Sequence, residues 1–129
     1  MPVIHISLIK GRTADQKREL LDQLHHALKE TLKIPVHDRT QILHEYTAED
    51  FIVPPGKTNN YTLIEIMMFS GRSKDVKQAL FSGITKRLSH VGISPADVFI
   101  ILNEQPLDNW GIRGGQQASR VDLGFKVDL

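Results

Sequence analysis

The sequence predicts an α+β fold, a two-layer sandwich in which a four-stranded mixed sheet carries two helices on one face. Three observations lead to this prediction. The length of 129 residues suits a single domain, residues 3–13 recur at 63–73, and each repeat has the pattern strand, helix, strand. We expect one domain over residues 1–129, made of two β-α-β repeats at about 1–58 and 61–115 and a C-terminal tail.

The internal repeat runs through most of the chain. Residues 3–13, which read VIHISLIKGRT, align without a gap with residues 63–73, which read LIEIMMFSGRS. After a one-residue slip, four positions of the first half align with four of the second: Ile34, Asp38, Leu43 and Glu45 with Ile93, Asp97, Leu102 and Glu104. Agreement at this density indicates two copies of one structural unit.

The first repeat begins with an apolar, β-branched stretch at 3–9, which predicts a strand. A Gly-Arg-Thr turn follows, and Thr13 with Gln16 has the spacing of a capping box, which predicts a helix start. The helix carries a leucine every four residues, and these form an apolar stripe: Leu20, Leu24, Leu28 and Leu32. A second strand is expected at about 40–46, after the Ile34-Pro35 turn.

The second repeat has the same order of elements. A strand is expected at 63–69, a helix with Ser73 as its N-cap candidate, and a strand at about 98–103. The second helix repeats the apolar stripe through Leu80, Ile84 and Leu88, with Phe81 and Val91 beside it. Each strand-helix-strand unit implies two parallel strands joined by a right-handed crossover. Both helices then cover the same face of the sheet if a pseudo-twofold relates the halves.

The other face of the predicted sheet has no helix to cover it. Residues 98–102, Val-Phe-Ile-Ile-Leu, are apolar at odd and even positions alike, so both faces of this strand should be buried. A large exposed apolar patch is unusual for a monomer. We therefore expect a homo-oligomer whose sheets pack together, with sites at the subunit boundaries.

Composition excludes several classes of protein. Sixteen basic residues balance 15 acidic ones, so no overall field would attract nucleic acid or an anionic membrane. There is no cysteine, which excludes disulfides and thiolate chemistry and suits the cytoplasm. The longest apolar stretch is far shorter than the ~20 residues of a membrane span, and no signal-peptide pattern opens the chain. The six histidines show no metal-ligand spacing, so we expect neither a metal nor an organic cofactor.

The order of these features resembles the tautomerase superfamily. The resemblance is carried by the start PVIHI at 2–6, the Gly-Arg-Thr turn before a helix containing Lys17, the strand after Pro35, and the glycine-rich tail around Trp110. Short members of that family supply one β-α-β unit per chain and form hexamers, and fused members form trimers. The segments PVHDRTQ at 35–41 and SGRS at 70–73 are most similar to the malonate semialdehyde decarboxylase-like branch. A homotrimer acting on a small carboxylate-bearing oxo acid is what the resemblance implies.

Pro2 is the candidate catalytic base. If Met1 is removed, Pro2 becomes a secondary amine, and an α-amino group has a reference pKa of about 7.7–8.0. An apolar pocket or a nearby arginine lowers that pKa and gives a base, whereas a nearby carboxylate raises it and gives an acid. Many proteins begin Met-Pro for reasons of processing alone, so the hypothesis rests on the repeat and the tail as well as on the position.

Five further residues are candidates for the site. Arg72 matches the branch's carboxylate-binding arginine, and Arg12 stands at the same place in the first repeat, each just before a helix N-terminus. A second arginine of the branch is replaced here by Ser70. Asp38 matches an aspartate that the branch places near its proline, although Asp97 at the equivalent place suggests a shared turn role. Two tail residues complete the set as substrate-binding candidates: Trp110, which could wall the pocket and exclude water, and Arg113.

Three functions remain open at this point. The leading one is cofactor-independent keto-enol isomerisation of a small 2-oxo acid, with Pro2 as base and Arg72, with or without Arg12, holding the carboxylate. The second is a malonate semialdehyde decarboxylase-like lyase, which would use a protonated proline. The third is a non-catalytic trimer of the same fold that binds a ligand or partner.

Overall fold

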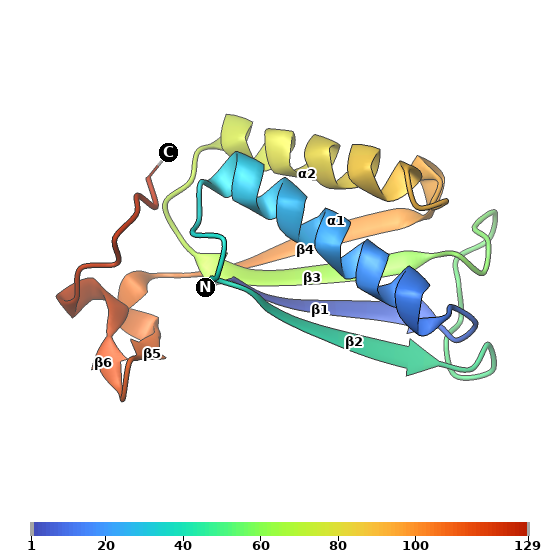
Figure 1. The fold of residues 1–129 in the computed structure, drawn as a ribbon, viewed down its shortest axis with the longest axis horizontal. Coiled ribbons are helices and arrows are strands. Elements are labelled where there is room, and N and C mark those ends of the chain that lie inside the picture. Colours follow the sequence, from blue (N-terminus) through green and yellow to red (C-terminus); the bar gives the residue numbers. More distant parts are fainter. Residues whose placement is uncertain (1, 129) are drawn as a thin grey trace.

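The computed structural model describes residues 2–128 and confirms the α+β prediction. The chain runs in the order β1 (Pro2–Ile9), α1 (Ala14–Leu32), β2 (Thr40–Tyr46), β3 (Thr62–Phe69), α2 (Lys74–Ser89) and β4 (Val98–Gln105). The sheet has the order β2-β1-β3-β4, with parallel outer pairs and an antiparallel central pair. Both helices lie on one face of it (Figure 1).

A pseudo-twofold axis relates the two halves of the sheet. His5 lies directly opposite Glu65 in the antiparallel pair of β1 and β3, and the same two residues correspond in the sequence repeat. The axis therefore passes through this pair. An ion pair between helix and strand occurs in both halves, from Lys17 to Glu45 at 2.9 Å and from Lys77 to Glu104 at 2.5 Å.

The helix starts are those that the sequence predicts. The Thr13 hydroxyl accepts a hydrogen bond from the Gln16 backbone N–H, and the Gln16 side chain accepts one from the Thr13 N–H, which completes the capping box. In the second half, the Ser73 hydroxyl accepts from the Val76 N–H. Each cap fixes the direction in which its helix leaves the sheet. It therefore also fixes the backbone position of the preceding arginine, Arg12 or Arg72.

The core lies between the sheet and the helices. The predicted leucine stripe of α1 and the apolar stripe of α2 are buried there against β1 and β3. The innermost strand residues are fully buried: Ile4, Ile6, Leu8, Ile64, Ile66 and Met68. Burying one such side chain stabilises the fold by about 1.5–3 kcal/mol, so the scaffold that carries the strand ends is rigid.

The opposite face of the sheet is uncovered in the single chain. Phe99 is 51% exposed and Ile101 is 45% exposed, while Val98, Ile100 and Leu102 pack against the core. Burial of β4 on both faces, expected from the sequence, would require another subunit, and it stays a prediction.

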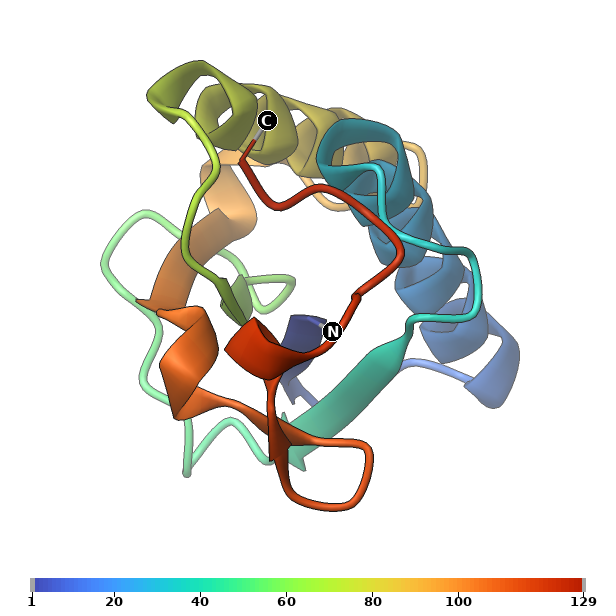
Figure 2. The same ribbon diagram turned by 90° about the vertical axis from the view of Figure 1, so that its left-hand side faces the viewer.

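The tail after β4 folds back across one end of the sheet. It contains a small hairpin, β5 (Gly111–Ile112) with β6 (Gln116–Gln117), and then runs between the hairpin and the helices. Figure 2 looks onto this end, where the tail arches in front of the start of β1. The other end of the sheet carries the connector between β2 and β3 (Figure 1).

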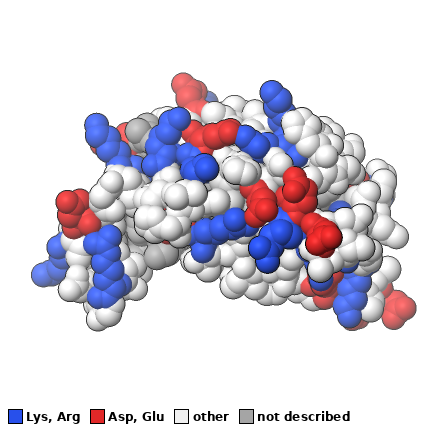
Figure 3. Space-filling view, viewed as in Figure 1, with Lys and Arg blue, Asp and Glu red and all other residues white. Residues whose placement is uncertain are grey.

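Charges of both signs are interspersed over the surface. Figure 3 shows lysines and arginines beside aspartates and glutamates on the visible face, in keeping with a formal net charge of +1. Neither described helix has the length and apolarity that crossing a membrane demands.

Candidate active site

Three of the candidate residues lie at the same end of the sheet. Pro2 opens β1, is buried and pairs with Met68 near the end of β3. Asp38 precedes β2, which runs parallel to β1 from Val3 opposite Thr40. Arg72 follows β3 on the same side. This end, where β1 and β2 start and β3 and β4 finish, is the end that the tail crosses (Figure 2).

Arg72 is the buried cation of this end. Its side chain is 5% exposed, and its Nη1 donates a long hydrogen bond of 3.4 Å to the Phe69 carbonyl oxygen. Burial lowers the pKa of Arg72, and the carboxylates of Glu104 and then Asp38 act in the opposite direction. Nε is buried and has no hydrogen-bond partner among residues 2–128. A buried guanidinium stays charged and its unmet donor is costly, so an anionic oxygen at Nε would stabilise it.

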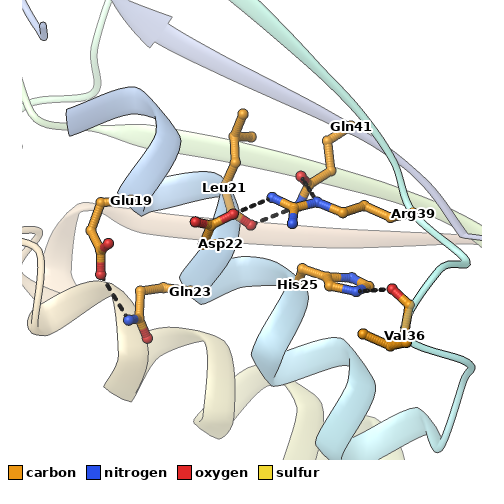
Figure 4. A network of polar contacts seen from close by, with 8 residues as sticks. All are labelled: Glu19, Leu21, Asp22, Gln23, His25, Val36, Arg39 and Gln41. Carbon is orange, nitrogen blue, oxygen red and sulfur yellow. Dashed lines mark hydrogen bonds and ion pairs between the residues drawn. The ribbon is translucent and has the colours of Figure 1, made fainter. Parts of the chain in front are cut away.

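The segment carrying Asp38 is held in place by α1. His25, which is buried, bonds through Nε2 to the Val36 carbonyl oxygen at 2.8 Å, and Arg39 Nη2 donates to Asp22 Oδ1 at 2.7 Å. Figure 4 shows these two anchors, at Val36 and at Arg39. Gln41 also donates to the Leu21 carbonyl oxygen, so the start of β2 is fixed as well. The half-buried Asp38 is therefore on a rigid turn, with the Arg72 charge near it.

A cavity of about 310 Å³ opens beside these residues. Its lining combines the turn before β2 with the tail: Pro35, His37, Asp38, Phe69, Gly111, Ile112, Arg113, Leu123 and Phe125. Of the candidate residues, Asp38 and Arg113 belong to this lining, whereas Pro2, Arg72 and Trp110 do not. A cavity of this size is at the small end of ligand sites.

Aromatic rings form one side of the site. Phe69, at the end of β3, makes an edge contact with Trp110 at 4.9 Å between ring centroids and stacks with Phe125 at 6.4 Å. Trp110 donates through Nε1 to the Gln105 carbonyl oxygen at 3.2 Å, so its indole is fixed against β4. Trp110 thus supports the wall through Phe69. The apolar rings of this wall favour the neutral over the charged form of an ionisable group beside them.

The tail holds Arg113 at the cavity and closes over Gly71. Arg113 has a positive φ of 48° and donates from Nη1 to the Asp122 carbonyl oxygen at 2.9 Å, which links the hairpin to the last segment. Farther along, a Cβ built on Gly71 would lie 2.7 Å from the Val127 carbonyl oxygen. Backbone packing this tight is possible only at a glycine.

Arg12 lies at the opposite end of the sheet, beyond the last residue of β1. Because β1 and β3 are antiparallel, the turns that follow them point to opposite ends. Within one chain Arg12 and Arg72 therefore do not form a joint clamp. Asp97, the repeat partner of Asp38, is likewise at that far end, where it is buried and accepts hydrogen bonds from the Thr58 N–H and hydroxyl.

Comparison with known proteins shows the family of this chain. A family model described as a tautomerase enzyme matches residues 38–113, and another with the same description matches residues 2–57. The chain belongs to the tautomerase superfamily. Probable tautomerase YrdN of Bacillus subtilis is 28% identical over 122 residues, which cover 90% of this chain and 94% of that protein.

Solved structures share the whole tautomerase fold of this chain. The crystal structure of FG41 malonate semialdehyde decarboxylase inhibited by 3-bromopropiolate is 32% identical, with a TM-score of 0.82, covering 89% of this chain and 92% of that one. A fused 4-OT described as a wild-type symmetric trimer is 27% identical, with a TM-score of 0.81 and coverage of 91% and 96%. Both matches cover about nine-tenths of this tautomerase superfamily member.

Three residues of this candidate site were not predicted from the sequence. His37 and Phe125 line the cavity, and Glu104 is the first carboxylate to act on Arg72. The repeat contained a signal for Glu104, because it aligns with Glu45 and Lys77 aligns with Lys17. Phe125 lies beyond the repeat, where no periodicity exists to interpret. Within the described range 2–128, no three His, Asp or Glu side chains are placed to hold a metal ion.

Proposed function

We propose that this protein is a cofactor-independent tautomerase of small 2-oxo acids that uses a free N-terminal Pro2 as its base. The observation that carries the proposal is the buried Arg72 with its unmet Nε donor, at the end of the sheet where β1 begins with Pro2. A carboxylate is the simplest group that fits such a donor. Met1, whose removal frees the Pro2 nitrogen, lies outside the described residues.

The proposed reaction moves one proton and changes no redox state. The neutral amine of Pro2 takes the proton from the enol hydroxyl, and the oxygen lone pair forms the carbonyl. The electron pair of the carbon-carbon double bond then accepts a proton at carbon from the ammonium, which restores the amine. Arg72 holds the substrate carboxylate in place, and positioning of this kind lowers the barrier without covalent chemistry.

The electrostatics favour a base over an acid at Pro2. A cation and an apolar environment both disfavour an ammonium, and Arg72 and the Phe69 wall, at the same end of the sheet as Pro2, are the groups that would supply them. Asp38 would favour the ammonium, but its charge also acts on Arg72, which offsets part of its effect on the amine. We therefore expect an apparent pKa for Pro2 below the reference value of about 7.7–8.0 for an α-amine.

The proposed active form is a homotrimer. The apolar side chains of Phe99 and Ile101 are exposed on the uncovered face of the sheet, and a similar fused protein is described as a symmetric trimer. Closing that face would remove β4 from water on both sides, as its sequence predicts.

A decarboxylase-like lyase is the second candidate. It is favoured by the 32% identity to a malonate semialdehyde decarboxylase and by Asp38 at the Pro2 end of the sheet. In that reaction a protonated Pro2 would polarise the aldehyde while the carbon-carboxylate bond breaks and carbon dioxide leaves. The electron pair of that bond passes into the enolate, which then takes a proton at carbon to give the product aldehyde. Ser70 stands where the branch has a second arginine, which weakens the grip on the carboxylate that must break away.

The pH profile of kcat/KM separates these functions. Intact mass first establishes a free N-terminal Pro2, and the substrates are the enol form of phenylpyruvate and malonate semialdehyde. A tautomerase gains activity with rising pH through an apparent pKa below that of an ordinary α-amine, and Pro2→Ala abolishes the gain. Activity that falls across pH ~7–9 on malonate semialdehyde selects the lyase. A protein with free Pro2 that turns over neither compound is a non-catalytic member of the fold.

A further inference from the structure

A larger cavity, of about 570 Å³, lies at the far end of the sheet from Pro2. It is bounded by the turn after β1, the first turns of α1, the connector before β3 and the turn after α2. Its polar lining includes Lys10, Arg12, Glu19, Asn59, Asn60 and His90. None of these residues belongs to the site proposed above.

The pseudo-twofold makes this cavity the counterpart of the Pro2 end. Arg12 corresponds to Arg72, and beside each arginine lies the same pairing of a helix lysine with a strand glutamate. Burial lowers the pKa of Arg12, as it does for Arg72, with Glu45 acting in the opposite direction. Glu45 is already held by the Lys17 ammonium at 2.9 Å, so the cationic character of Arg12 is only partly offset.

The far end of the sheet lacks a catalytic base. The position of Pro2 is taken by Thr62, whose nitrogen is an internal amide with no basicity and whose side chain is fully buried. Asp97, in the position of Asp38, is occupied by its hydrogen bonds to Thr58. A ligand bound at this end would therefore meet an arginine but no base.

The far end is also more open than the Pro2 end. A Cβ built on Gly11 meets nothing within 4 Å, whereas one built on Gly71 would meet the tail at 2.7 Å. Arg12 is half-buried and borders the open cavity, while Arg72 lies under the tail. The tail thus covers the Pro2 end of the sheet and leaves the far end accessible.

Charge at the far cavity favours an anion. Lys10 and Arg12 outnumber Glu19, whose carboxylate accepts a hydrogen bond from the Gln23 amide. The backbone N–H groups of Thr13 and Gln16 are used by the capping box, so a ligand would depend on the side chains. The volume holds a small organic acid with space to spare. We propose that this cavity is a second, non-catalytic binding site for a small carboxylate anion.

A titration with pyruvate, followed by amide NMR of the intact ¹⁵N-labelled protein, tests the site. Gly11 and Gly92 report on the far cavity, and Gly111 reports on the cavity at the Pro2 end. Saturable shifts at Gly11 and Gly92 are expected in the wild type. Arg12→Gln should weaken that binding roughly tenfold or more, as loss of a charge-assisted hydrogen bond does, while the Gly111 shifts remain. Arg72→Gln should do the reverse.

Charge removal at Glu19 gives a test of opposite sign. Glu19→Gln should tighten pyruvate binding at the far cavity about two- to fivefold, because one repulsive charge is lost. Glu49→Gln, at an exposed position outside the cavity lining, is the matched control and should leave it unchanged. If Arg12→Gln does not fold, the Glu19 pair decides alone. Absence of saturable shifts at Gly11 and Gly92, shifts that survive Arg12→Gln, or no tightening in Glu19→Gln overturns the proposal, whatever turnover shows at Pro2.

Discussion

Replacing Gly71 with alanine should destabilise the protein more than the same change at its repeat partner, Gly11. Both glycines have φ values that other residues rarely adopt, 138° and 147°, so each variant should lose about 1–3 kcal/mol through backbone strain. The difference lies in the surroundings. The new Cβ at position 71 would be 2.7 Å from the Val127 carbonyl oxygen, and the one at position 11 would meet open space.

The extra cost at Gly71 has an upper bound set by the tail. A contact of 2.7 Å with backbone cannot persist, so the last segment must move away and release Phe125 from Phe69. Phe125 is half-buried, and exposing it costs about 0.8–1.5 kcal/mol, half the value of about 1.5–3 kcal/mol for a fully buried large apolar side chain. Gly71→Ala should therefore exceed Gly11→Ala by about that amount.

Urea unfolding of both variants at one protein concentration measures the difference. With a slope of about 1–3 kcal/mol per molar urea, the midpoint of Gly71→Ala should fall about 0.3–1.5 M below that of Gly11→Ala. The emission of Trp110 should change in the folded Gly71 variant alone, because Phe69 links this indole to the displaced ring. Equal midpoints with unchanged emission would show that the tail does not pack on Gly71 as described.

Three further predictions concern the site, the far end and the assembly. Arg72→Ala should lower kcat/KM on a 2-oxo-acid enol, which corresponds to about 2–3 kcal/mol of lost transition-state stabilisation. Arg18→Ala, on the exposed face of α1, is the control and should leave kcat/KM unchanged. Equal kinetics in the two variants would assign Arg72 to the turn alone. Asp97→Asn should lower the Tm at neutral pH, because hydrogen bonds from Thr58 lower the pKa of Asp97 and stabilise its charged form. Stability from a depressed carboxyl pKa is present above the unfolded value of about 3.9 and is lost as pH falls through the folded value, so the Tm curves of wild type and variant should converge in acid; parallel curves would contradict this. Light scattering should give three times the 14.6 kDa of one chain, and Ile101→Glu should lower that mass; a stable wild-type monomer would refute the trimer.

Much of the fold could be predicted because its signals are local and periodic. The repeat and the caps predict the starts of both helices, and all four main strands have bounds within two residues of those observed. The arginines show what a sequence repeat leaves open. Within one chain Arg12 and Arg72 lie at opposite ends of the sheet, because β1 and β3 are antiparallel, so their joint action stays a prediction that would need neighbouring subunits. The geometry was implicit in the repeat, but an alignment of residues does not display direction.

The tail could not be predicted because its contacts are long-range and specific. Phe125 meets Phe69 across 56 positions, and the Val127 carbonyl oxygen meets Gly71 through backbone packing that leaves no compositional trace. Asp38 and Asp97 also show that the sequence does not predict such long-range contacts. They align in the sequence, yet one lies near Arg72 and the other is bonded to the connector at Thr58. What a side chain meets depends on segments outside the repeat.

Duplication in one chain has a chemical consequence that symmetry alone would not suggest. A chain has two ends of its sheet and two arginines after strands, but it has only one N-terminus and so at most one free proline amine. The far end has the cation Arg12 but no base, because the nitrogen of Thr62 is part of a peptide bond. In separate subunits the two ends would be equivalent, whereas in a fused chain they must differ. Arg12 and the Lys17–Glu45 pair therefore stand at an end without a free amine, so within one chain they can offer an anion a cation but no proline base.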